Sequence, residues 1–135
     1  MTDTIRTKSA LQTLLADNTS RAISPQDLRD FLVSVLGAAY RVTVSTATYT
    51  VTGNDVNLHV TRTATGTCVI TIPTTLITDH RELNIKDAGN NCNTYNITIQ
   101  TQGAEEIEFT TSPLVMSIDG QSITLYSDGT DLFIK

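Results

Sequence analysis

The residues best suited to acid–base or metal chemistry lie together in the segment LITDHREL, which contains Asp79, His80 and Glu82. Carboxylates beside a histidine can transfer protons or bind a divalent cation when a fold brings them together. Closeness in sequence does not make a site, and the spacing matches no H-E-x-x-H or related motif. We therefore interpret this segment as a solvated turn.

The other residues that could support chemistry also lack the surroundings that the chemistry needs. His59 alternates with Leu58 and Val60, which predicts that its side chain points outward from a strand. No serine lies in a G-x-S-x-G elbow, and no glycine-rich loop is placed to hold a phosphate. Asp128-Gly129-Thr130-Asp131 resembles part of a calcium loop but lacks the further carboxylates, so a hairpin turn is favoured. We predict no enzymatic activity and no catalytic, cofactor-binding or metal site.

The two cysteines, Cys68 and Cys92, are separated by 24 positions. Cys68 shares the parity of Ile70 and Ile72, which places it on the expected core face, whereas Cys92 falls in the polar segment DAGNNCNTYN. There is no C-x-x-C motif and no nearby histidine pair, so a metal site is disfavoured. A structural disulfide is also disfavoured in a product of the cytosol.

Carbohydrate binding is a class that many β-sandwiches support through exposed aromatic rings. This chain has four tyrosines, three phenylalanines and no tryptophan, and several of these rings fall on expected core faces. The sequence therefore offers no stacking platform, although polar loops could still contact a sugar. The seven aromatic residues are Phe31, Tyr40, Tyr49, Tyr95, Phe109, Tyr126 and Phe133.

Composition limits the remaining classes. The 135 residues suffice for one domain and a short arm, with 39% hydrophobic and 17% charged residues. A net charge of −5 and nine scattered basic residues argue against a nucleic-acid partner. No apolar run approaches the roughly 20 residues that cross a bilayer, and the first ten residues lack a secretory signal. Synthesis in the cytosol is expected.

The elements that would position these residues change in character near residue 38. Before that point the apolar period is helical, and a first helix is expected from about residue 10 to 17. A second helix is marked by Ser24 as N-cap, Pro25 at its first position, and Gly37 as C-cap. Such short helices are marginal alone, so each apolar stripe must be buried against the other helix, the β-domain or another chain. The stripe residues predicted to dock or oligomerise are Leu11, Leu14, Leu15, Leu28, Phe31, Leu32 and Val35.

From Tyr40 onward, apolar and polar residues alternate with period two, which predicts strands with one buried and one wet face. The parity of the apolar residues changes after Val44, so a bulge or break is expected near residues 45–48. Turn signals such as Asp119-Gly120 and Asp128-Gly129 separate the runs. The apolar runs are Val42/Val44, Val56/Leu58/Val60, Cys68/Ile70/Ile72, Leu83/Ile85, Tyr95/Ile97/Ile99, Ile107/Phe109, Leu114/Met116/Ile118, Ile123/Leu125 and Leu132/Ile134.

The resulting fold prediction is a mainly β protein. We expect eight or nine antiparallel strands without intervening helix, arranged as a sandwich, a jelly roll or a small barrel. Residues 39–135 would form this β-domain, preceded by a helical docking and oligomerisation segment at residues 1–38. The 25 threonines, most of them in or near strands, would keep the outer faces polar without adding charge.

Two stretches resemble proteins of tailed-bacteriophage virions, especially tail fibres and other fibrous appendages. The first is LLADNTSRAISPQDLRDFLVS at residues 14–34. The second comprises RELNIKDAGNNCNTYNITIQTQGAEEIEF and the closing hairpin SITLYSDGTDLFIK. The resemblance covers roughly residues 9–36 and 67–135, and Leu132-Phe133 stands where the family usually has tryptophan.

This resemblance implies a virion structural protein that is made in the cytoplasm of a host bacterium and forms a homotrimer. Among virion roles, a compact chain without sustained heptads favours a capsid decoration (cement) or head-fibre protein. The alternatives are a small tail, collar or baseplate protein for host attachment, and a stand-alone carbohydrate-binding module. The expected partners are other copies of the chain, the major capsid protein or tail proteins, and host surface glycans. Nucleic acid, membrane and cofactors are not expected.

Overall fold

The computed structural model describes residues 28, 31, 41–62, 66–78 and 81–135. The chain divides into two compact units, Met1–Tyr40 and Arg41–Lys135, and each is considered by itself. The expected helices lie outside the described residues, apart from Leu28 and Phe31, whose backbone is helical. The second unit is the β-domain.

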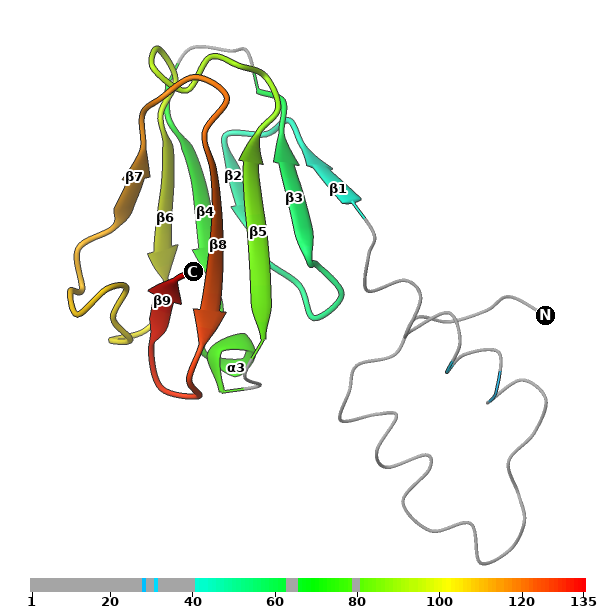
Figure 1. Cartoon of the computed structure of the whole chain (residues 1–135), viewed down its shortest axis with the longest axis vertical. Helices are drawn as coiled ribbons and strands as arrows, with labels where there is room; N and C mark the ends of the chain where they lie inside the picture. Colours follow the sequence, from blue (N-terminus) through cyan, green and yellow to red (C-terminus); the bar gives the residue numbers. More distant parts are fainter. Residues whose placement is uncertain (1–27, 29–30, 32–40, 63–65, 79–80) are drawn as a thin grey trace, which may run out of the picture. The chain divides into compact units, whose positions relative to one another are not determined.

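The described part of the β-domain forms nine strands in two sheets (Figure 1). The five strands of sheet A, in spatial order, are β1 (Arg41–Val44), β3 (Asn57–Val60), β5 (Glu82–Asp87), β8 (Ser122–Ser127) and β9 (Leu132–Ile134). The four strands of sheet B, in spatial order, are β2 (Thr48–Thr50), β4 (Cys68–Ile72), β6 (Ile97–Thr101) and β7 (Leu114–Met116).

The chain winds between the two sheets in successive coils. Consecutive strands from β1 to β6 alternate between the two sheets. Within sheet A, β1, β3 and β5 therefore pair in parallel, and within sheet B, β2, β4 and β6 do the same. Only the last three strands add antiparallel pairs: β7 pairs with β6, β8 with β5, and β9 with β8. The β-domain is therefore a solenoid-like sandwich whose last coil is closed by antiparallel strands.

The prediction of an antiparallel domain was wrong for four of the seven strand pairs. Period-two alternation was assigned to antiparallel sheets because parallel sheets are usually covered by helices on both faces. Here each crossover between parallel neighbours is a strand of the opposite sheet. The outer faces therefore stay wet, and the alternation survives in parallel strands.

The hydrophobic core lies between the sheets and is built from the inward residues of both. In sheet A, Leu58 pairs with Ile85 and Ile85 with Ile123; in sheet B, Ile70 pairs with Ile99. This confirms the inward parity predicted for most apolar runs. The buried core residues are Val44, Val51, Leu58, Val60, Cys68, Ile70, Ile72, Ile77, Leu83, Ile85, Cys92, Ile97, Ile99, Ile107, Met116, Leu125 and Leu132.

Local predictions had mixed outcomes. The break near residues 45–48 is confirmed, because there the chain leaves β1 in sheet A and enters β2 in sheet B. The prediction that no helix lies between the strands was wrong. One helical turn, α3 (Thr74–Ile77), lies in the connection from β4 to β5, and its Ile77 is buried. Ile118 was also wrongly assigned to the core, because it is 67% exposed in the connection after β7. The glycines of the two predicted Asp-Gly turns, Gly120 and Gly129, both have positive φ.

Candidate functional site

The predicted docking residues lie almost entirely outside the described residues. This applies to Leu11, Leu14, Leu15, Leu32 and Val35. The remaining two are described: Leu28 has a 55% exposed side chain, and Phe31 is half-buried. The exposed side chain of Leu28 has surface available for a partner.

Of the three residues considered for acid–base chemistry, only Glu82 is described. Asp79 and His80 lie outside the described residues, whereas Glu82 lies in β5 and not in a turn. The Glu82 carboxylate accepts a hydrogen bond from Lys135 Nζ at 2.7 Å. His59 lies in β3 with its side chain on the outer face, as predicted. Within the described ranges, no three His, Cys, Asp or Glu side chains are grouped to hold a metal ion.

The turn at Asp128 has the hairpin geometry that was preferred over a calcium loop. Asp128 Oδ1 accepts hydrogen bonds from the amides of Thr130 and Asp131, both at 2.9 Å. Gly129 has a φ of +101°, a conformation that suits glycine. The Asp128 carboxylate therefore contributes to the turn between β8 and β9.

Both cysteines are free and buried in the core. The core position predicted for Cys68 is confirmed, and Cys92 lies in the polar loop between β5 and β6 as predicted, although its side chain is fully buried. The Cys92 thiol donates to the carbonyl of Met116 at 2.8 Å. Burial raises the pKa of both thiols, and for Cys68 the nearby Arg62 opposes this effect. These thiols are therefore protonated, internal side chains.

Two buried carboxylates hold the ends of strands in place. Asp87 Oδ2 at the end of β5 accepts from the amides of Asn91 and Cys92 at 3.0 Å each and of Gly120 at 2.9 Å. Asp55 Oδ2 accepts from Tyr49 Oη at 2.9 Å and from the amide of Thr52 at 2.6 Å. Burial, followed by the hydrogen bond to Asp55 and its charge, raises the pKa of Tyr49 to about 12. Both carboxylates serve loop structure.

The outer face of sheet A carries rows of polar side chains that the strand register aligns. One row crosses from Arg41 through Asn57 and Asn84 to Thr124. Asn84 Nδ2 donates to Asn57 Oδ1 at 3.0 Å, and Thr124 Oγ1 donates to Asn84 Oδ1 at 2.5 Å. Beside this row is a shallow depression of about 350 Å³, lined by Asn57, Leu58, His59, Asn84, Lys86 and Ser122.

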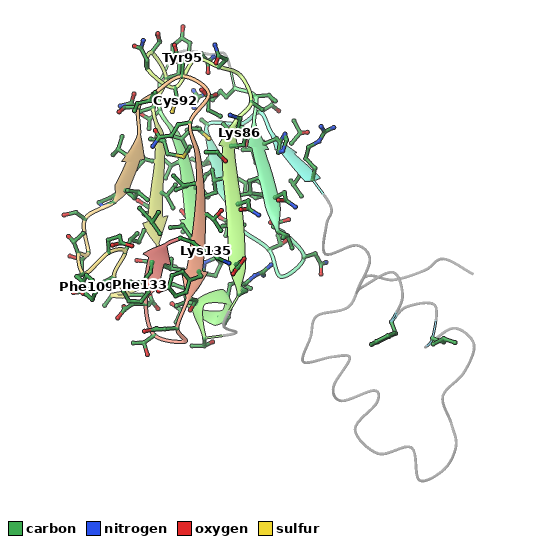
Figure 2. All side chains as sticks on the ribbon, viewed as in Figure 1. Lys86, Cys92, Tyr95, Phe109, Phe133 and Lys135 are labelled. Atoms are coloured by element: carbon green, nitrogen blue, oxygen red, sulfur yellow. The ribbon has the colours of Figure 1, made fainter. Side chains whose placement is uncertain are left out.

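Three aromatic rings form a second feature of the same face, here called the aromatic cluster: Phe109, Tyr126 and Phe133. The centroids of Phe109 and Phe133 are 5.3 Å apart in an edge-to-face arrangement, and those of Tyr126 and Phe133 are 5.5 Å apart. Figure 2 shows Phe109 and Phe133 together beside β9, with Lys86 toward the other end of the sheet. Phe109 is 79% exposed and Tyr126 is 39% exposed.

Phe109 reaches the surface on a tight turn. The amide of Ile107 donates to the carbonyl of Thr110 at 2.8 Å, and the amide of Thr110 donates back at 3.3 Å. The two residues between them, Glu108 and Phe109, have φ values of +52° and +64°. Glycine or asparagine is usual at such positions, because most other side chains strain the backbone at positive φ. The turn is attached to β9 by the Ile134 amide, which donates to Glu108 Oε1 at 2.5 Å.

Sequence reasoning missed the aromatic cluster for two reasons. Phe109 was assigned to the core because it alternates with Ile107, but only Ile107 is buried, since the chain reverses between them. Tyr126 and Phe133 have the outward parity that the alternation indicates. They are neighbours because the register of β8 and β9 pairs them, and alternation within one strand does not predict that register. The Asp128-Gly129 turn was the one signal that could have brought these two rings together, because it joins their strands in a hairpin.

Neither protein-family models nor curated proteins provide a match for the chain. Among the residues described, no helix has the length and apolar character needed to cross a membrane.

Proposed function

We propose that this chain is a structural protein of a tailed-bacteriophage virion, a homotrimer that docks through residues 1–38 and exposes its β-domain. The observation that carries the proposal is the 55% exposed Leu28, which lies within the segment that resembles phage appendage proteins. An amphipathic segment gains stability when its apolar stripe is buried, and another chain can supply that burial.

The β-domain supports this role through its outer surface. Threonine, asparagine and serine side chains keep its exposed strand faces polar, while only 17% of the residues in the chain are charged. Such a surface stays hydrated alone but costs less to desolvate at a lattice contact than a surface rich in charge. Among virion positions we favour a capsid decoration or head-fibre protein, with a small tail, collar or baseplate protein as the alternative.

A second candidate function, a carbohydrate-binding module, is favoured by one observation. Three of the seven aromatic rings gather on the outer face of sheet A, and two of them are well exposed. Exposed rings of this kind can stack on sugars. The two functions are compatible, because a domain displayed on a virion can also contact a host glycan.

The proposal is tested by the mass of the free protein and by its place on the particle. Light scattering of the purified chain should give three times the 14.6 kDa subunit mass. Antibody-gold labelling of intact virions should decorate regular positions on the head, whereas labelling of the tail would support the alternative location. Virions without label, together with a monomeric protein, would contradict the proposal.

A further inference from the structure

The aromatic cluster is joined to polar groups on the same sheet face. Glu82 on β5, Tyr126 on β8 and Phe133 on β9 lie in one register row. Lys135 Nζ reaches Glu82 at 2.7 Å, and both side chains of this ion pair are more than half exposed. The next rows hold Thr124 and then Ser122. A ligand that matches this face therefore has an apolar face for the rings and hydrogen-bonding groups for the polar rows.

The size of the cluster argues against a protein as that ligand. An aromatic side chain has roughly 150–250 Å² of surface. With Phe109 at 79% and Tyr126 at 39% exposure, the cluster offers on the order of 300 Å². A stable protein interface buries about 800 Å² on each partner. The Glu82–Lys135 ion pair lies in the register row of Tyr126, and the next row holds Asn84 and Thr124.

We propose that the outer face of sheet A binds an oligosaccharide, with a sugar ring stacked on an exposed ring of the aromatic cluster, Phe109 or Tyr126. The carbon–hydrogen face of a sugar matches the rings, and its hydroxyl groups match the carboxylate of Glu82, the ammonium of Lys135 and the hydroxyl of Thr124. Ser122, beside the depression, lies four residues from Tyr126 along β8, which is about 13 Å at the rise of a strand. Several linked sugar residues fit along this length.

Backbone hydrogen bonds and a ring contact position the cluster. The hydrogen bonds of the 107–110 turn and the contact between Phe109 and Phe133 hold the rings on β9. Ordering such side chains upon binding would weaken affinity, so a fixed platform favours a ligand that makes few contacts. The strained φ of Phe109 is explained if the position is kept for its ring and not for the turn.

This inference deepens the proposal of a displayed β-domain and rests on it for its biological setting, but its test uses the purified full-length chain. The chain is applied to an array of neutral, N-acetylated and uronic-acid-containing oligosaccharides, and the best-bound one is titrated by calorimetry. Phe109→Gly and Tyr126→Ala should each lower the affinity about tenfold, the scale of losing one aromatic contact. Tyr126→Phe, which keeps the ring, should bind within about twofold of the wild type.

Val115→Ala is the matched control, because Val115 is 46% exposed on β7 of the other sheet and lies outside the cluster. It should bind as the wild type does. Circular dichroism of every variant establishes that the β-domain is folded. The inference is overturned if no oligosaccharide of the array binds, or if Phe109→Gly and Tyr126→Ala bind as well as the wild type. It is also overturned if those two substitutions abolish self-association, since a second copy would then cover the cluster. Virion labelling is independent of all these outcomes.

Discussion

At the scale of single residues, Tyr49 and Asp55 form a contact whose strength depends on pH. The phenol donates to Asp55 Oδ2 at 2.9 Å, and an ionised phenolate would lose this bond and face a carboxylate. Burial and this contact raise the pKa of Tyr49 from 10.0 to about 12. Because the folded pKa exceeds the unfolded one, the stabilisation is complete below pH 10 and is lost as the pH rises toward 12.

The corresponding prediction concerns Tyr49→Phe. The wild type should lose unfolding free energy between pH 10 and 12, and the variant should lack this part of the decrease. Denaturant titrations across this range measure the effect, and the tyrosinate absorbance that the substitution removes locates the pKa. An absorbance change centred near 10 would contradict the assignment.

Phe109 provides a second prediction at the residue scale, which concerns stability alone. At its φ of +64°, alanine keeps the strain of the left-handed conformation, whereas glycine does not. Glycine avoids the cost of the left-handed conformation but loses more conformational entropy on folding. The difference between these two effects should make Phe109→Gly about 0.5–1 kcal/mol more stable than Phe109→Ala. Urea denaturation measures the difference.

Val115 in β7 is the control position for this comparison of glycine and alanine variants. In an ordinary strand the preference reverses, so Val115→Gly should be roughly 0.5–1 kcal/mol less stable than Val115→Ala. The same order at both positions would mean that the turn at residue 109 is not strained.

The burial of a residue could be predicted from the sequence where the local strand pattern determines it, and not where a distant side chain does. Leu58, Ile70 and Ile85 are buried as their period indicates, because parity within a strand depends only on the local chain. Cys92 could not be placed in this way. Its burial depends on Asp87, which draws the loop inward through the amides of Asn91 and Cys92. A polar sequence can surround a buried position when a distant side chain satisfies its backbone.

At the scale of elements, the loops at the end of β5 are joined by one carboxylate. Asp87 Oδ2 holds the loop after β5 through two amides and the β7–β8 connection through the amide of Gly120. All three donors are left without this partner in Asp87→Ala. Hydrogen bonds to a charged group contribute about 1.5–3 kcal/mol each and are not additive, so we expect a loss of at least about 3 kcal/mol.

Asp119→Ala is the matched control for Asp87→Ala. Asp119 belongs to the same region but accepts one exposed hydrogen bond, from the amide of Asn93 at 2.8 Å. Its removal should cost less than about 1.5 kcal/mol. Urea denaturation of both variants distinguishes the roles, and equal losses would show that Asp87 does not join the two loops.

The spatial order of the strands could not be predicted from the sequence, because it depends on contacts between distant segments. Arg41 pairs with Asn57 and Asn57 with Asn84, so two successive coils in sheet A span 16 and 27 residues. Such unequal coils leave no internal repeat to detect. Alternation predicted that strands exist and which face is wet, whereas pairing partners depended on where loops such as 88–96 fold back.

At the scale of the whole molecule, the described residues of the β-domain form a hydrophobic core among themselves, from Val44 to Leu132. Its inward residues close both sheets around Leu58, Ile85 and Ile99, and the described part of the chain leaves no buried side-chain nitrogen or oxygen without a hydrogen bond. Folding of this unit should therefore tolerate changes in residues 1–38. That independence makes the docking role of the N-terminal segment testable by single substitutions.

The final prediction concerns Leu28→Asp and Phe31→Asp. If residues 1–38 dock or trimerise the protein, either substitution places an unpaired charge in a desolvated contact, which costs several kcal/mol of association energy. The variants should remain soluble and β-rich by circular dichroism, yet light scattering should report monomers and virions should no longer be labelled. Ile118→Asp, at a 67% exposed position of the β-domain, adds the same charge elsewhere and should assemble normally. Loss of the whole fold in Leu28→Asp would instead indicate that the segment completes the core of its own chain, and unchanged assembly would remove the docking function from it.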